Sequence, residues 1–386
     1  MAPLRVAAFV CLGALPLAAA GSNWVAVDSP TFERNSVLLQ VAFTADGKVG
    51  YAGAGTPSCP ASIIKSTDSG RTWDTMWPLN CTTIDFNLFL SSAVRDPTHA
   101  VVGGAFYQTW TNDGKHIYPA LNNFGTPPQD AGVIPGSGQF ALVSGKETRV
   151  GGNTIDVSDT GEKYTRIPIP DSVMNSTDFL ARYGSFPTKD VWYITAGTFG
   201  ATPPRYSKHY TIDKKTTTVS FDVDSSNGSP YSAGIVKTTD GGSTWELVFK
   251  NDDTGDNIYP NGIDCISATN CVAVLEGESA RIIVTRDGGR TWKETMHDDD
   301  PKSSLMAVSM ISEKEVWVAG GHPSTPNFEG RFWHSLDGGD TWTKEAFPGT
   351  YIVSLDMHGA QNGYAVALTD TNPAGLKLFK YVPSSN

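Results

Sequence analysis

The chain has 386 residues, 18% of them charged, and a formal net charge of −11. A surface this acidic repels phosphate groups, so it argues against nucleic acid and against an anionic membrane surface as partners. The 39 glycines agree with a β-rich chain that contains many turns.

The chain begins with the pattern of a targeting segment. Arg5 supplies a positive charge, an apolar stretch follows it, and three alanines stand directly before Gly21. The pattern predicts a signal peptide over residues 1–20, removed by cleavage after the alanines. The alternative is a membrane anchor, for which the apolar stretch is too short. We therefore expect a secreted mature protein over residues 21–386, with no membrane insertion.

One eight-residue signature, Ser/Thr-x-Asp-x-Gly-x-Thr-Trp, recurs along the mature chain in four clear and two worn copies, which we call Asp turns. The Asp side chain is expected to accept backbone hydrogen bonds, and the Gly to supply a positive φ. The Trp is expected to bury its ring against the neighbouring element. The residues that we assign to these structural places are Asp68, Gly70 and Trp73; Asp159 and Gly161; Asp240, Gly242 and Trp245; Asp287, Gly289 and Trp292; Asp337, Gly339 and Trp342.

The spacing of the turns predicts the fold. The third residue of the signature falls at 68, 112 (an Asn), 159, 240, 287 and 337, so the intervals are 44, 47, 81, 47 and 50 residues. A propeller blade of four short strands takes roughly 40 to 50 residues. The long interval is then one blade, the fourth, with an insertion at about 198–234. Alternation in the insertion predicts an extra β-hairpin there.

The last blade is expected to contain both ends of the chain. Three apolar segments follow Trp342 without another Asp turn, while Trp24 and its neighbours look like the strand that follows such a turn. An N-terminal strand that completes the C-terminal blade removes two free sheet edges. We predict an all-β, seven-bladed β-propeller in one domain. A six-bladed ring and two smaller domains are the alternatives.

The repeated turn resembles the Asp-box, or bacterial neuraminidase repeat, β-propellers. That superfamily includes sialidases, sortilin-type receptors, some endoglucanases and the photosystem II assembly and stability factors. Repeat length and blade count look most similar to the assembly-factor-like seven-bladed propellers, over nearly the whole mature chain. The resemblance to sialidases and sortilin-type propellers is more distant. The resemblance implies the fold, because unrelated functions share it. The net charge of −11 departs from the basic surface patch that the assembly-factor resemblance implies.

Four cysteines follow the signal segment, and an even number in a secreted chain predicts disulfides. We expect the pairs Cys59–Cys81 and Cys265–Cys271, each within one blade. A zinc site is the alternative, but no Cys-x-x-Cys or paired His accompanies these cysteines. The sequons predict glycosylation at Asn80, Asn175 and Asn227.

Ligand sites of propellers lie on the face opposite the Asp turns. Carboxylates that we place on that face, and therefore regard as catalytic candidates, are Asp85, Asp178, Asp264 and Glu276. A pair of them at a suitable separation would serve acid–base chemistry. Each also fits a solvated or backbone-capping role. The Arg-Ile-Pro segment at 166–168 follows an Asp turn instead of preceding one, which argues against a sialidase.

Two acidic loops, 252–257 and 297–300, suit calcium, a basic partner or simple solvation. We find no phosphate-binding loop, paired metal-binding histidines or other cofactor motif, so we expect no metal and no cofactor. The sequence favours a monomeric, secreted, non-catalytic binding module or scaffold for protein or glycan ligands. The alternative is a secreted carbohydrate-active enzyme, either a glycoside hydrolase or a polysaccharide lyase. Whether the chain is an enzyme is left open.

Overall fold

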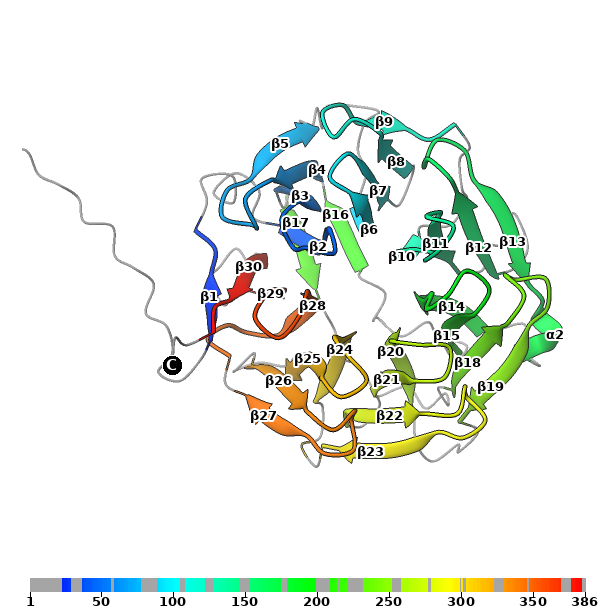
Figure 1. Ribbon diagram of the computed structural model, residues 1–386. Helices are drawn as coiled ribbons and strands as arrows, with labels where there is room; N and C mark the ends of the chain where they lie inside the picture. The colour runs from blue at the N-terminus through cyan, green and yellow to red at the C-terminus, as the bar shows by residue number, and fades with distance from the viewer. Residues whose placement is uncertain are drawn as a thin grey trace, which may run out of the picture.

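Seven four-stranded antiparallel sheets surround a central axis in the computed structural model (Figure 1). The structure describes these residues: 23–28, 37–56, 59–77, 89–104, 108–121, 128–145, 153–174, 179–198, 209–213, 216–220, 232–251, 258–276, 279–298, 300, 303–322, 329–345, 347–368 and 376–383. Within them, the short α2 (Asp171–Met174) is the one helix. The prediction of an all-β, seven-bladed propeller is confirmed.

Each sheet is one blade, and the strands of each blade are given below in order from the axis outwards. Blade 1 consists of β2 (Val37–Phe43), β3 (Gly50–Thr56), β4 (Cys59–Ser66) and β5 (Asp74–Trp77), and blade 2 of β6 (Phe89–Asp96), β7 (His99–Gly104), β8 (Gln108–Thr111) and β9 (Tyr118–Pro119). Blade 3 consists of β10 (Pro128–Val133), β11 (Phe140–Ser144), β12 (Asn153–Ser158) and β13 (Thr165–Ile169), and blade 4 of β14 (Phe179–Ser185), β15 (Trp192–Thr198), β18 (Ser232–Thr238) and β19 (Glu246–Lys250). Blade 5 consists of β20 (Tyr259–Cys265), β21 (Cys271–Glu276), β22 (Arg281–Thr285) and β23 (Lys293–His297), and blade 6 of β24 (Ser304–Met310), β25 (Val316–His322), β26 (Glu329–Ser335) and β27 (Thr343–Glu345). Blade 7 consists of β28 (Ile352–Met357), β29 (Gly363–Leu368), β30 (Leu376–Tyr381) and β1 (Trp24–Ala26).

The N-terminal strand closes the ring, as predicted. β1 is the outer strand of blade 7 and pairs antiparallel with β30, with Trp24 opposite Tyr381. The Trp24 side chain is fully buried, and its ring stacks on Phe332 of blade 6 with 4.5 Å between centroids. The first strand therefore completes one blade and packs against the blade before it.

The four clear Asp turns share one hydrogen-bond pattern. In the first, the Asp68 carboxylate accepts bonds from the Thr72 N–H at 2.9 Å and the Thr72 hydroxyl at 2.7 Å. The Gly70 N–H donates to the Ser66 hydroxyl at 2.9 Å, and Gly70 has a φ of +74°. The same bonds recur around Asp240, Asp287 and Asp337.

The two worn turns use other side chains. In the second turn the carboxylate is Asp113, one residue after the expected Asn112, and it accepts the His116 N–H at 2.8 Å. In the third turn the Gly161 N–H donates to the Ser158 hydroxyl at 2.8 Å. The Asp159 carboxylate instead accepts a bond from the Gln139 side chain. Ser158 thus has the role that Ser66 has in the first turn, while the Asp159 carboxylate bonds to a residue outside its turn.

Three blades carry the same connection to the next blade, which we call the inter-blade clasp. Its parts are a tyrosine on the second strand and the lysine opposite it on the third. The tyrosine hydroxyl and the lysine ammonium each donate to a carbonyl oxygen in a turn of the next blade. Tyr193 donates to the Ala268 carbonyl at 2.7 Å, and Lys237 donates to the Gly288 carbonyl at 2.8 Å. The three clasps are Tyr51–Lys65, Tyr193–Lys237 and Tyr364–Lys380.

Arginines perform the same task at two further junctions. Arg95 of blade 2 donates to the Asp159 carbonyl in the third Asp turn at 2.8 Å. Arg286 of blade 5 donates to the Gly338 carbonyl in the sixth Asp turn at 3.0 Å. In the described part of the chain, five blade junctions therefore place a positive side chain on the backbone of the next blade's turn, or, after blade 7, on that of blade 1.

Two features predicted near blades 4 and 5 are present. Cys265 and Cys271 are cross-strand partners joined as a disulfide. The hairpin β16 (His209–Asp213) and β17 (Thr216–Ser220) is inserted between β15 and β18. Cys59 begins β4, but its side chain and Cys81 lie outside the described residues. So do the sequon residues Asn80, Asn175 and Asn227.

Blade 7 joins blade 1 through an aspartate and a histidine. Asp356 accepts the Phe43 N–H at 2.9 Å, and His358 Nε2 lies 3.0 Å from the same carboxylate oxygen. Burial favours neutral His358, but the charge and hydrogen bond of Asp356, helped by Asp46, outweigh it. The pKa of His358 is therefore raised above its ordinary value.

We expect replacement of Gly70 by alanine to destabilise the protein more than the same change at Gly359. Both residues have a positive φ, but a Cβ at Gly70 would lie 2.7 Å from Cε1 of Tyr364, whereas nothing lies within 4 Å at Gly359. Gly359→Ala then costs only the left-handed backbone, about 1 to 2 kcal/mol. Gly70→Ala adds a clash, for a total of about 3 kcal/mol or more. Urea unfolding measures both, and equal losses would contradict the assigned packing.

We expect the free energy of unfolding to depend on pH through His358. A raised folded-state pKa stabilises the protein fully below the ordinary value of about 6.5, and this contribution is lost as pH rises through the folded pKa. The wild type should therefore exceed His358→Gln in stability by more at pH 6 than at pH 8.5. Asp356→Asn, which removes the facing charge, should reduce that difference. A stability difference between wild type and His358→Gln that does not change with pH would rule out an ion pair between His358 and Asp356.

Candidate binding site in the central channel

The inner strands all break register near their first residues. One residue in each of the seven strands is unpaired at a β-bulge: Leu39, Leu90, Gln129, Arg182, Asn261, Met306 and Val353. Inner strands begin at the loops between blades, so this level lies towards the face opposite the Asp turns. Bulges of this kind re-aim side chains at barrel rims and beside functional sites. We call this level the bulge ring.

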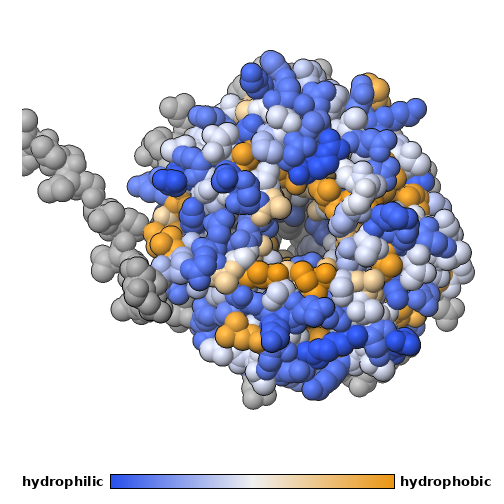
Figure 2. Space-filling view, in the orientation of Figure 1, coloured by the Kyte–Doolittle hydropathy of each residue, from blue (hydrophilic) through white to orange (hydrophobic). Residues whose placement is uncertain are grey.

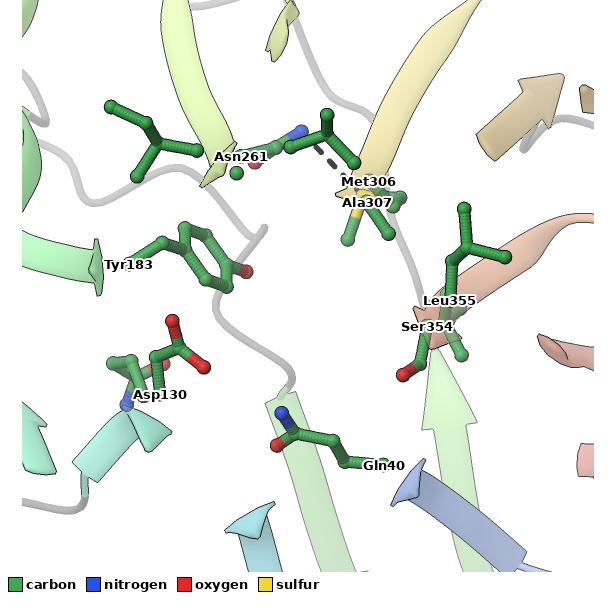
Figure 3. A pocket seen from close by; sticks show the side chains of 13 residues that line it. Gln40, Asp130, Tyr183, Asn261, Met306, Ala307, Ser354 and Leu355 are labelled. Atoms are coloured by element: carbon green, nitrogen blue, oxygen red, sulfur yellow. Dashed lines mark hydrogen bonds between the residues drawn. The ribbon is translucent and has the colours of Figure 1, made fainter. Parts of the chain in front are cut away.

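A cavity of about 110 Å³ occupies the channel at the bulge ring. The space-filling view shows an opening at the centre of the molecule (Figure 2). Side chains from six blades surround the cavity (Figure 3), and the polar ones are Gln40, Gln129, Asp130, Tyr183, Asn261 and Ser354. Each of these six lies at a bulge or directly after one, so the irregular register places them together.

The cavity lining offers mainly uncharged hydrogen-bonding groups. Among the residues that the structure describes, the lining contains one carboxylate, that of Asp130, and neither lysine nor arginine. The side-chain carbonyl oxygen of Gln40 is buried and accepts no hydrogen bond. Buried polar atoms without a partner are rare in proteins, and one that lines a cavity marks a place for a donor from a ligand or water.

Asp130 is fixed by the backbone of two blades. Its carboxylate accepts the Ala131 N–H at 2.9 Å and, across the junction, the Gly184 N–H of blade 4 at 3.0 Å. The labelled view places this carboxylate beside the Tyr183 hydroxyl at the edge of the cavity (Figure 3). The single negative charge of the lining is thus held rigidly.

A buried arginine supports the wall behind Tyr183. Arg182 is 7% exposed and donates from Nη2 to the Tyr183 hydroxyl oxygen at 3.1 Å. Its guanidinium carbon lies 4.7 Å from the ring centroid of Tyr259 in blade 5. Contact between a guanidinium and an aromatic face is favourable, particularly away from water. The arginine therefore fixes the tyrosine from behind.

Glu276 belongs to the same buried group. It is the last residue of β21, opposite Tyr259, and burial raises its pKa. The Ser304 hydroxyl donates to its carboxylate, and the Tyr351 hydroxyl donates in turn to Ser304 at 3.0 Å. Glu276 lies towards the expected face, but it is enclosed in the channel wall.

Asp264 lies at the other end of blade 5. It is the penultimate residue of β20, opposite Val272, beside the turn on the Asp-turn side. Its carboxylate accepts the Met310 N–H and the Cys265 N–H, each at 2.8 Å, and burial raises its pKa. The structure therefore separates Asp264 from Glu276 and gives it a backbone-bridging position. Asp85 and Asp178, the other candidates, lie outside the described residues.

The second acidic loop is occupied by an arginine. Arg331 contacts Asp298 at 3.2 Å, Asp300 at 2.5 Å and Glu329 at 3.0 Å. Across the residues that the structure describes, no group of His, Cys, Asp or Glu is arranged to hold a metal ion. The sequence offered calcium, a basic partner or solvation for this loop, and the structure instead pairs it with an arginine of the same blade ring. The first acidic loop is largely outside the described residues.

The sequence did contain a signal for the cavity. Gln40 stands inside the apolar run of β2, and Asn261 and Ser354 occupy comparable places in β20 and β28. A polar residue within an otherwise apolar inner strand marks a side chain that does not face the packing between blades. The bulges that bring these residues to one level were not visible in the sequence.

Among the described helices and strands, no helix is long and apolar enough to cross a bilayer. No family model and no curated protein sequence matches the chain. Solved structures do resemble it. YCF48 bound to D1 peptide matches with 17% identity and a TM-score of 0.58, over 94% of this chain and 98% of the other.

Two carbohydrate-active enzymes also match in structure. The GH74 xyloglucanase from Xanthomonas campestris shows 13% identity and a TM-score of 0.60 over 92% of this chain. The match spans 55% of the xyloglucanase, so this chain is about half its length. A PL25 ulvan lyase shows 9% identity and a TM-score of 0.55, over 89% of this chain and 93% of the other. At these identities the similarity shows the propeller fold alone.

Proposed function

We propose that the chain is a secreted Asp-box β-propeller that acts as a non-catalytic binding module or scaffold. Its ligand enters the channel from the face opposite the Asp turns and contacts the bulge ring. The observation that carries this proposal is the cavity itself. It is lined by fixed, mostly uncharged hydrogen-bonding side chains, one of which, Gln40, has a buried oxygen without a donor. Concave sites with a few precisely placed polar groups are typical of ligand binding.

The positions of the described carboxylates favour binding over hydrolysis. Glycoside hydrolysis uses two carboxyl groups that face each other across roughly 5 to 9.5 Å. Glu276 and Asp264 lie at opposite ends of their blade, and both are already bonded to protein groups. Asp130 is the one carboxylate at the cavity, and it is held by backbone N–H groups.

The class of ligand is a protein or a glycan. A peptide accompanies the similar YCF48 structure, and the two similar enzymes are named for the polysaccharides xyloglucan and ulvan. The net charge of −11 disfavours strongly anionic ligands. Secretion through residues 1–20, the second disulfide, glycosylation and a monomeric state are parts of the same proposal and rest on the sequence.

A carbohydrate-active enzyme is the second candidate, and one observation favours it. Glu276 is a buried carboxyl group with a raised pKa, close to Arg182 and Tyr259 in the wall of the channel. Enzymes use such carboxyl groups as general acids. The serine and tyrosine bonds around Glu276 fit a structural role equally well.

We expect Gln40→Leu to weaken binding to a ligand found in a screen. The mature protein is tested by calorimetry against panels of peptides and neutral and anionic polysaccharides. Loss of one or two hydrogen bonds predicts roughly tenfold weaker affinity for Gln40→Leu. The control Leu336→Ala changes an exposed residue of the sixth Asp turn and should leave affinity unchanged. Release of sugar products from any polysaccharide, or a loss with Leu336→Ala but not Gln40→Leu, would contradict the proposal.

A further inference from the structure

The electrostatics of the channel cavity favour a positive guest. The lining combines the Asp130 carboxylate with side-chain oxygens of Gln40, Asn261 and Ser354, and its described residues include no lysine or arginine. The chain as a whole carries a net charge of −11. A carboxylate, sulfate or phosphate entering this cavity would lose its hydration without gaining a facing cation.

The buried Arg182 behind the cavity wall does not change this balance. Arg182 lies behind Tyr183, with its guanidinium against the rings of Tyr183 and Tyr259. The charge of Arg182 interacts with Glu276 inside the wall. Arg182 therefore supports the wall of the site, and its positive charge faces the two tyrosine rings and Glu276.

The size of the cavity selects a slender group. Its volume is about 110 Å³. An engineered protein cavity of about 150 Å³ holds a benzene molecule, and one water occupies about 30 Å³ in the liquid. A pyranose ring with its hydroxyl groups is bulkier than benzene. An unbranched four-carbon chain that enters end-on is narrower and fits the smaller space.

We propose that the cavity receives the ammonium end of a lysine side chain from a polypeptide ligand. This rests on the proposed function, since it names the ligand of the same site. An ammonium group has three donors and no acceptor, so it matches the Gln40 oxygen that lacks a donor and the negative charge of Asp130. The methylene stem would lie along the apolar lining residues Met306, Val308 and Leu355.

The test compares peptides that differ only at one side chain. A pentapeptide with a central lysine between alanines, blocked at both ends, is titrated into the mature protein. The same peptide with acetyl-lysine or norleucine at the centre, and a neutral methyl glucoside, are the comparison probes. We expect the lysine peptide to bind at least tenfold more tightly than the other probes. Its affinity should fall as salt is raised, because the interaction is between charges.

Two variants locate the binding. Asp130→Asn removes the charge and keeps an acceptor for one of the two backbone N–H groups that Asp130 binds, and Gln40→Leu removes the unpaired oxygen. Each is expected to reduce affinity for the lysine peptide about tenfold while thermal unfolding shows a folded protein. The matched control, Asp340→Asn, removes a negative charge from an exposed Asp turn and should change nothing.

Several outcomes would overturn the inference. Equal binding of the norleucine or acetyl-lysine peptide would do so, as would unchanged affinity in both folded variants. Binding of the glucoside in preference to the lysine peptide, lost with Gln40→Leu, would overturn the lysine assignment and leave the binding function intact. If no probe binds and the wider panels of peptides and polysaccharides yield no ligand, both the lysine assignment and the proposed binding function are overturned.

Discussion

The ring depends on positive side chains that bind the backbone of a neighbouring blade. A lysine or arginine donates to a turn carbonyl at five junctions in the described structure, and Lys237 with Tyr193 shows the pattern at its clearest. Carbonyl oxygens in a turn carry partial negative charge and have lone pairs left after local bonding. The Asp turn presents its carbonyls outward because its aspartate and threonine side chains satisfy its N–H groups. Each of these five blades is thus joined to the next blade in the ring.

This fastening lies on the Asp-turn side, and it leaves the opposite ends of the inner strands free to serve another purpose. There the seven inner strands bulge, and side chains from six blades, polar ones from five of them, meet around one cavity. Bridges such as Asp130 to the Gly184 N–H hold neighbouring inner strands together at that level. The channel therefore combines a rigid frame with one buried oxygen, that of Gln40, which the frame itself does not use. That combination is what a preorganised binding site requires.

Sequence periodicity predicted the number of blades, the closing strand at Trp24 and the bonding of the four clear turns, because each depends on local residues repeated at a fixed spacing. It did not predict the bond of Asp159, whose side chain accepts from Gln139 outside the turn. It also failed to separate Asp264 from Glu276, which lie at opposite ends of the β20–β21 pair. The clasps and the bulge ring were missed because they join residues of different blades. A repeat shows where a blade lies, but not which atoms of the next blade it meets.

The account divides the molecule into a framework face, at the Asp turns, and a binding face, at the bulge ring. Hydrogen exchange of the whole protein, with and without the ligand found in the binding panels, tests this division most directly. The account predicts slower exchange in the peptides that contain the starts of β2, β10, β14, β20, β24 and β28, and no change in the Asp turns at 66–73, 285–292 and 335–342. Protection concentrated at those Asp turns, with the inner strands unchanged, would contradict it.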